Sequence, residues 1–213
     1  MTFRETPEET KQKECHRLIV ELLGQEYVHL NLVGELKIHE NLENSQTKVV
    51  CNVRVRGEDF PVVGVGKGPV DALYSSLSKM LLVEYCSLAN FYFLEFGVYT
   101  NLLKKNRPPT HPNNASFIDA LLIIRNGDGN DFVFRARDCS VIGASMRVAV
   151  SAIEYLVNLE EAVVKVYAAL KDAENRNRDD LVRKFTNKLI QLVDRSSYEE
   201  VIRRQRESGD GEI

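Results

Sequence analysis

The chain has 213 residues, of which 44% are hydrophobic and 28% charged, and its formal net charge is −3. This composition is typical of a globular protein with one compact domain and room for an extension. The small negative charge gives no electrostatic case for a nucleic-acid partner. No apolar run approaches the roughly 18–20 residues that a membrane span needs. We therefore expect neither nucleic acid nor a membrane as a partner.

The cysteines and histidines are scattered along the chain. Cys15, Cys51, Cys86 and Cys139 form no CxxC motif, and the four histidines show no metal-ligand spacing. The sequence therefore predicts no metal and no cofactor, and it indicates buried thiols in a reducing compartment. The first residues lack the basic-then-apolar pattern of a signal peptide. Together these features predict a cytoplasmic protein.

The first predicted element is a helix from Pro7 to about Leu23. Thr6 suits the N-cap and Pro7 the first helical position, while Gly24 suits the end. The apolar stripe of this helix is thin, so we expect one face to pack and the rest to face solvent.

Alternating apolar and polar residues follow, which is typical of strands. Strands are expected over residues 27–33, 35–39, 47–56 and 60–63. A glycine-dense turn from Gly64 to Gly68 then leads into a helix from Pro69 to about Glu84, because glycine allows a positive φ and close backbone approach, and proline suits a helix start.

The second half of the chain follows the same order. Strands are expected over residues 88–100, 117–125 and 131–137, with an exposed loop at residues 107–114. A helix capped by Asp138 or Ser140 runs to about Leu156 and either continues or breaks near Asn158. An amphipathic helix over residues 181–193 follows, and residues 208–213 are expected to be disordered.

This order predicts an α+β fold built from a tandem βββα repeat with pseudo-two-fold symmetry, in which both helices lie on one side of antiparallel sheets. An N-terminal helix and a C-terminal helical extension complete it. The expected divisions are an N-terminal helix (1–25), a repeat domain (26–158, with repeats at about 26–86 and 87–158) and an extension (159–213).

The glycine-dense turn is the first candidate for a ligand site, since the exposed amides of a helix start attract an anion. The spacing G-x-G-x-G followed by proline matches neither the Walker A loop nor the dinucleotide fingerprint. Two interpretations stay open: an anion site, or a sharp corner between strand and helix. In either case, the negative charge of Asp71 in the first helical turn interacts favourably with the helix dipole.

No catalytic arrangement is visible in the sequence. Ser140 and Ser145 have no neighbouring histidine for nucleophilic chemistry. Arg135 and Arg137 alternate on one predicted strand, which indicates one exposed face. We therefore expect a protein that is not an enzyme.

Gly66-Lys67-Gly68-Pro69-Val70-Asp71-Ala72 resembles a G-x-G-P-V-D-A turn of a known family. That family is the C-terminal allosteric (regulatory, dimerisation) domain of 2-isopropylmalate synthase and of the related citramalate synthase. The second repeat of that domain has a small-Ala-Ser sequence at its helix start, and Ser140-Val141-Ile142-Gly143-Ala144-Ser145-Met146 stands in that place. The resemblance covers about residues 27–158.

The resemblance implies a homodimer that binds a branched-chain amino acid of the leucine or isoleucine type. By position, it implies ligand contacts from both helix starts: Gly66, Gly68, Pro69, Val70, Asp71 and Ala72 in the first, and Ser140, Ile142, Ala144 and Ser145 in the second. Whole synthases also carry a catalytic barrel of some 250 residues, for which this chain has no room. We therefore expect a free-standing, non-catalytic module rather than an excised domain.

Two alternatives remain beside this expectation. The chain is either a structural or protein-interaction protein that kept the fold and lost the ligand, or a trans-acting regulatory subunit whose partner is the catalytic chain of a barrel-only synthase. The helical tail and Lys67 in the glycine turn keep the first alternative open.

Overall fold

The computed structural model describes residues 6–100 and 117–193. They form an α+β fold of two three-stranded antiparallel sheets and four α-helices. The helices are α1 (Pro7–Leu23), α2 (Pro69–Leu81), α3 (Val141–Asn175) and α4 (Asp179–Val193). The strands are β1 (Leu30–Asn41), β2 (Gln46–Val55), β3 (Glu58–Gly66), β4 (Phe91–Thr100), β5 (Ile118–Asn126) and β6 (Asp131–Asp138). Three strands followed by a helix therefore occur twice, while the expected loop at 107–114 and the expected disordered end lie outside the described residues.

Local capping defines α1 as the sequence predicts. The Thr6 hydroxyl accepts a hydrogen bond from the Glu9 amide (3.2 Å), and the Glu9 carboxylate accepts one from the Thr6 amide (2.8 Å). This reciprocal pair is a capping box. Gly24, with φ +54°, ends the helix.

The first sheet has the order β1-β2-β3 and differs from the prediction at β1. One continuous strand replaces the two predicted ones, because the pairing register shifts between Val33 and Lys37. Gly34 lies in this shift with φ +70°. A bulge, rather than a turn, therefore interrupts the alternation of apolar residues.

The glycine-dense stretch also differs from the prediction, because β3 is longer than expected. Gly64 and Gly66 pair with Val49 and Thr47 of β2, so both glycines belong to the strand. Neither has a positive φ. The predicted turn is therefore reduced to Lys67 and Gly68, and the freedom of glycine to adopt positive φ is not the reason for the first two glycines.

The second sheet has the order β4-β5-β6. A 3-10 turn, η2 (Cys86–Asn90), precedes β4, so the strand begins three residues later than predicted, and α2 ends at Leu81 rather than near Glu84. A second 3-10 turn, η1 (Gly24–Glu26), links α1 to the first sheet.

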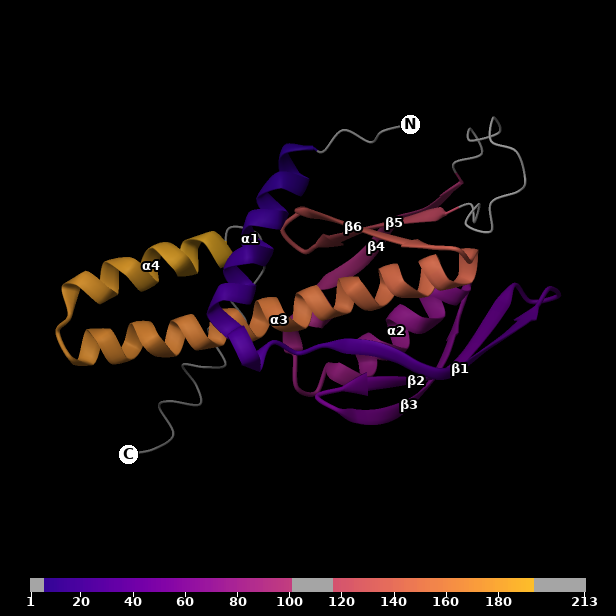
Figure 1. Ribbon diagram of the computed structural model, residues 1–213, viewed down its shortest axis with the longest axis horizontal. Helices are drawn as coiled ribbons and strands as arrows, with labels where there is room; N and C mark the ends of the chain where they lie inside the picture. Colours follow the sequence, from indigo (N-terminus) through magenta and orange to yellow (C-terminus); the bar gives the residue numbers. More distant parts are fainter. Residues whose placement is uncertain (1–5, 101–116, 194–213) are drawn as a thin grey trace, which may run out of the picture.

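The two repeat helices form a layer between the sheets (Figure 1). α2 packs on β2 and β3, α3 packs on β5 and β6, and the two helices contact each other. Tyr74 of α2 also meets Phe93 of β4 edge-to-face, with ring centroids 4.7 Å apart. The helix pair, with buried Leu73 and Ile153, thus supplies the inner face against which the sheets bury apolar side chains such as Val49, Leu122 and Phe132.

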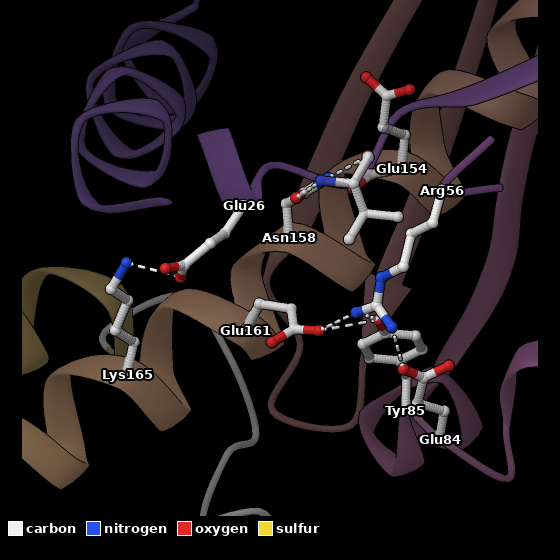
Figure 2. A network of polar contacts seen from close by, with 9 residues as sticks. Glu26, Arg56, Glu84, Tyr85, Glu154, Asn158, Glu161 and Lys165 are labelled. Carbon is white, nitrogen blue, oxygen red and sulfur yellow. Dashed lines mark hydrogen bonds and ion pairs between the residues drawn. The ribbon is translucent and has the colours of Figure 1, made fainter. Parts of the chain in front are cut away.

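The helix after β6 does not break near Asn158. The Asn158 side chain is fully buried in α3; its amide oxygen accepts from the Val28 amide (2.7 Å) and its nitrogen donates to the Val28 carbonyl (2.8 Å) (Figure 2). This polar residue satisfies the backbone just before β1. α3 therefore runs through the expected boundary at residue 158, and α4 folds back against its second half (Figure 1).

A second polar cluster in Figure 2 ties the first sheet to α3. Arg56, in the turn between β2 and β3, donates to Glu84 (2.7 Å), to the Tyr85 hydroxyl (2.8 Å) and to Glu161 (2.6 Å). Burial and the nearby charge of Glu161 raise the pKa of Tyr85, so its hydroxyl stays protonated and donates to Glu161 (2.9 Å). The middle of α3 is therefore tied to the turn between β2 and β3 and to the segment after α2.

Among the described helices, α3 alone is long and apolar enough to cross a membrane by length and composition. Its apolar window is mostly buried inside the protein, which is the pattern of a core helix. Arg147 and Glu154 interrupt the apolar residues in the first half of this helix, so its sequence contains no long uninterrupted apolar run.

Candidate functional site

The first strand-to-helix junction is closed by contact between β3 and α2. A Cβ atom at Gly64 would lie 2.1 Å from the Ala72 carbonyl oxygen, and one at Gly66 would lie 2.6 Å from the Ala72 amide nitrogen. Both distances are far below van der Waals contact. The two glycines are therefore required by the close approach of strand and helix.

Asp71 folds back over this junction from the first turn of α2. Its carboxylate accepts hydrogen bonds from the Lys67 amide (2.9 Å) and from the Ser75 hydroxyl (3.3 Å). The N-cap residue, Gly68, has no side chain to accept from the first amides of the helix. The first turn of α2 thus carries a carboxylate, and its first amides, those of Val70 and Asp71, have no side-chain acceptor at the N-cap.

The second junction is capped more completely. The Ser140 hydroxyl accepts from the Gly143 amide (3.3 Å) at the start of α3. Asp138, at the end of β6, accepts from the Ser140 amide (3.1 Å) and from the Arg147 guanidinium (2.7 Å). The bond from Arg147, followed by the bond from Ser140, lowers the pKa of Asp138, so the carboxylate is ionised at neutral pH.

Each junction contains one acid and one glycine, but the two residue types exchange places between strand and helix. At the first, the acid is on the helix (Asp71) and its carboxylate lies 2.5 Å from where a Gly66 Cβ would be. At the second, the acid is on the strand (Asp138), and a Gly143 Cβ would lie 2.8 Å from its carboxyl carbon. Counted from the two N-caps, Gly66 matches Asp138 and Asp71 matches Gly143. In both junctions a carboxylate fills the space between strand end and first helical turn.

The residues expected to contact a ligand divide by burial. Val70, Ala72, Ala144 and Ser145 are buried, and the Ser145 hydroxyl donates to the Val141 carbonyl (2.7 Å) within α3. The other expected residues reach the surface at least in part: Gly66, Gly68, Pro69, Asp71, Ser140 and Ile142. Only this second set is open to a ligand without a change in packing.

Figure 1 shows α2 and α3 starting at the same end of the molecule, where the β1–β2 hairpin lies. Within the described residues no hydrogen bond or ion pair joins the two junctions. They are therefore neighbouring ends of one helix layer, each closed by its own side chains.

Sequence reasoning missed Arg147 and the structural role of Gly143. Arg147 lies two turns into α3 and follows Gly143 at the i, i+4 spacing, so both residues are on the same face of the helix. The ion pair between Arg147 and Asp138 becomes apparent only once the position of Asp138 is known. The expectation of four buried thiols is also corrected: Cys139, in this junction, is exposed, while Cys15, Cys51 and Cys86 are buried.

The comparisons with known proteins assign no family to the chain. No protein-family model matches it, and no curated protein matches its sequence.

Proposed function

We propose that the protein is a non-catalytic module that binds a small amino acid, of the branched-chain type, at the start of α2. The observation that carries the proposal is the pairing of opposite polar groups there. The first turn of α2 has amides without an N-cap acceptor, and the same turn carries the Asp71 carboxylate. Such a pair complements a zwitterion, because the amides can hold its carboxylate and Asp71 its ammonium group.

Two further features support an amino acid over a simple anion. The Asp71 carboxylate would repel a bare anion, whereas it would attract an ammonium group. Ile142 and Val141, at the start of α3, are 38% and 45% exposed and offer an apolar surface for a branched side chain. The same ligand class follows from the sequence resemblance.

Calorimetric titration of the full chain with leucine, isoleucine and valine tests this proposal. We expect heat of binding from at least one of them, and weaker binding of 4-methylpentanoate, which lacks the ammonium group of leucine. Asp71→Asn should weaken binding at least about tenfold, since a hydrogen bond to a charged group contributes about 1.5 kcal/mol or more.

Asp179→Asn is the matched control, because Asp179 lies in the first turn of α4. It should leave the affinity unchanged. Absence of heat with every amino acid at millimolar concentration would contradict the ligand proposal.

We also propose that the two βββα units arose by duplication and are related by a pseudo-two-fold axis. This is supported by the same antiparallel strand order in both sheets and by the N-caps Gly68 and Ser140 at equivalent places. The reversed acid and glycine pairs support the duplication further, since each pair places one carboxylate between the strand end and the first helical turn.

We propose a homodimer in which β4 contacts a second copy. β4 is an edge strand, and its Tyr92, Leu94 and Phe96 side chains are 51%, 45% and 40% exposed. Exposed apolar side chains on an edge strand are typical of an interaction surface. Light scattering after size exclusion should give twice the mass of one chain, and Leu94→Lys should give a single chain.

Val83→Lys serves as the control for this measurement. Val83 is 91% exposed in the turn after α2 and does not belong to β4, so a lysine there should leave the dimer intact. A wild-type monomer, or a dimer that survives Leu94→Lys, would contradict this contact.

The second candidate function is a protein-interaction module that has lost its ligand. The observation that favours it is the occupation of junction amides by the protein's own carboxylates, Asp71 and Asp138. A homodimer that binds no amino acid in the titration above would select this candidate.

A further inference from the structure

A groove separate from both helix starts runs along the free edge of β6. It lies between α1, β6 and the first half of α3 and has a volume of about 630 Å³, within the range of small-molecule sites. The groove follows an edge strand, so side chains from both faces of β6 reach it. Its main side chains are Glu9, His16, Tyr27, Arg135, Arg137 and Tyr155. We call it the β6 groove.

Helix α1 forms one wall with polar side chains. The Gln12 side-chain oxygen accepts from the Val133 amide (2.9 Å), which satisfies one backbone donor on the edge of β6. Glu9 and His16 lie on the same face of α1, one turn before and one turn after Gln12. The α1 wall thus covers the strand edge without closing the groove.

Aromatic rings form the floor. Tyr155 and Phe134 are buried with their centroids 5.6 Å apart in an edge-on arrangement, and His16 lies 5.9 Å from Tyr155 and 6.1 Å from Tyr27. Rings in this arrangement accept a further ring by stacking or edge contact. The floor therefore suits an aromatic ligand.

A fixed chain of hydrogen bonds closes one end. Glu154 accepts from the Leu30 amide (2.7 Å) and from the Tyr27 hydroxyl (3.3 Å), and His16 Nε2 lies 3.1 Å from the Tyr27 oxygen. Burial and the charge of Glu154 raise the pKa of Tyr27, so its hydroxyl remains a donor. Glu154 is thus engaged by the protein's own donors.

Two guanidinium groups form the opposite wall. Arg135 and Arg137 are two residues apart on β6, so their side chains leave the same face about 7 Å apart along the strand. Arg135 Nη2 is bound to Glu9 (2.8 Å), and Arg137 to both oxygens of Asp119 (2.6 and 3.1 Å). These pairs orient the guanidinium groups before any ligand arrives.

The acids beside these arginines are already engaged. Burial by itself would raise the pKa of Glu9, but the hydrogen bonds from the Thr6 amide and Arg135 outweigh it and lower the pKa. Both carboxylates are paired with a guanidinium group, and the bond to Asp119 uses two of the five N–H donors of Arg137. The outer edge of such a guanidinium can still hold a second carboxylate.

We infer that the β6 groove binds a small aromatic carboxylate, with its ring on Tyr27 and Tyr155 and its carboxylate on Arg135 and Arg137. The aromatic floor selects the ring, and the oriented guanidinium wall selects an anion over a cation. Because the groove contains no residue of the two helix starts, this ligand is independent of the amino acid proposed above.

Ligand-observed NMR and calorimetry with the full chain test this inference, with phenylacetate as the probe. We expect phenylacetate to bind and benzylamine, which carries an ammonium on the same ring, to bind at least about tenfold more weakly. Arg137→Gln should weaken phenylacetate at least about tenfold. The Arg137 side chain is 65% exposed, so the variant should fold.

Arg54→Gln is the matched control. Arg54 binds Asp59 with the same two-bond geometry (2.6 and 3.0 Å), on β2 and outside the groove, so its loss should leave the affinity unchanged. Tyr27→Phe, which keeps the ring, should retain most of the binding. Equal binding of benzylamine, unchanged affinity in Arg137→Gln, or no binding of phenylacetate at about 10 mM would overturn the inference. Asp71→Asn should not affect phenylacetate, which separates this result from the amino-acid titration.

Discussion

Replacing Gly64 with alanine is expected to lower the free energy of unfolding by about 2–4 kcal/mol. The new Cβ would lie 2.1 Å from the Ala72 carbonyl oxygen and 2.8 Å from its carbon. Both are backbone atoms of α2, so no rotamer change can relieve the clash. The helix would have to move away from β3, which would also loosen Leu73 and Leu77 in the core between the sheets. Urea unfolding followed by circular dichroism measures the loss.

Gly68→Ala is the matched control for this prediction. Gly68 has an extended backbone (φ −161°), and nothing lies within 4 Å of its Cβ position. The cost should stay below about 1 kcal/mol, since alanine is only a poorer N-cap than glycine. If Gly64→Ala and Gly68→Ala cost the same, the close approach of β3 and α2 is not what requires glycine in this stretch.

Replacing Asn158 with leucine is expected to lower the free energy of unfolding by about 3 kcal/mol, since each buried group left unsatisfied costs about 1–3 kcal/mol. Leucine has nearly the same shape as asparagine but no polar atoms. The amide and the carbonyl of Val28 would both lose their partner at a buried position, and the carbonyl of Glu154 would lose a donor as well. The same urea titration gives the value.

Asn41→Ala is the comparison variant for Asn158. The Asn41 side chain accepts from the Glu43 amide in the exposed β1–β2 hairpin, where water can replace it. Its loss should stay within about 0.5 kcal/mol. A similarly small loss for Asn158→Leu would show that water, rather than Asn158, satisfies Val28.

The elements that the sequence predicted well are those defined by neighbouring residues. α1 begins and ends where its caps stand, because Thr6, Glu9 and Gly24 act within one turn of the helix. The order of strands and helices followed from alternation and periodicity in the same way. The continuity of α3 could not be decided locally, because the polar residue at its middle, Asn158, is explained by a partner 130 residues earlier.

The glycine-dense stretch shows how much of the candidate site could be predicted from the sequence. Its sequence predicted a junction and the helix start at Pro69, and both are present. The reason for Gly64 and Gly66 lies in the distance to Ala72, which only the packing of α2 on β3 defines. The same packing placed Val70, Ala72, Ala144 and Ser145 in the interior, which no pattern within the two turns distinguished from exposed positions.

The α+β class, the helix caps and the two strand-to-helix junctions were predictable from the sequence, because these depend on residues within a few positions of each other. The packing of helices on strands was needed to show that Asp71 and Asp138 fill equivalent spaces from opposite sides of their junctions. It alone also decided that α1, β6 and α3 enclose a groove with an aromatic floor and a guanidinium wall. These features join residues up to about 140 positions apart, as between His16 and Tyr155, and such contacts arise from packing rather than from local preference.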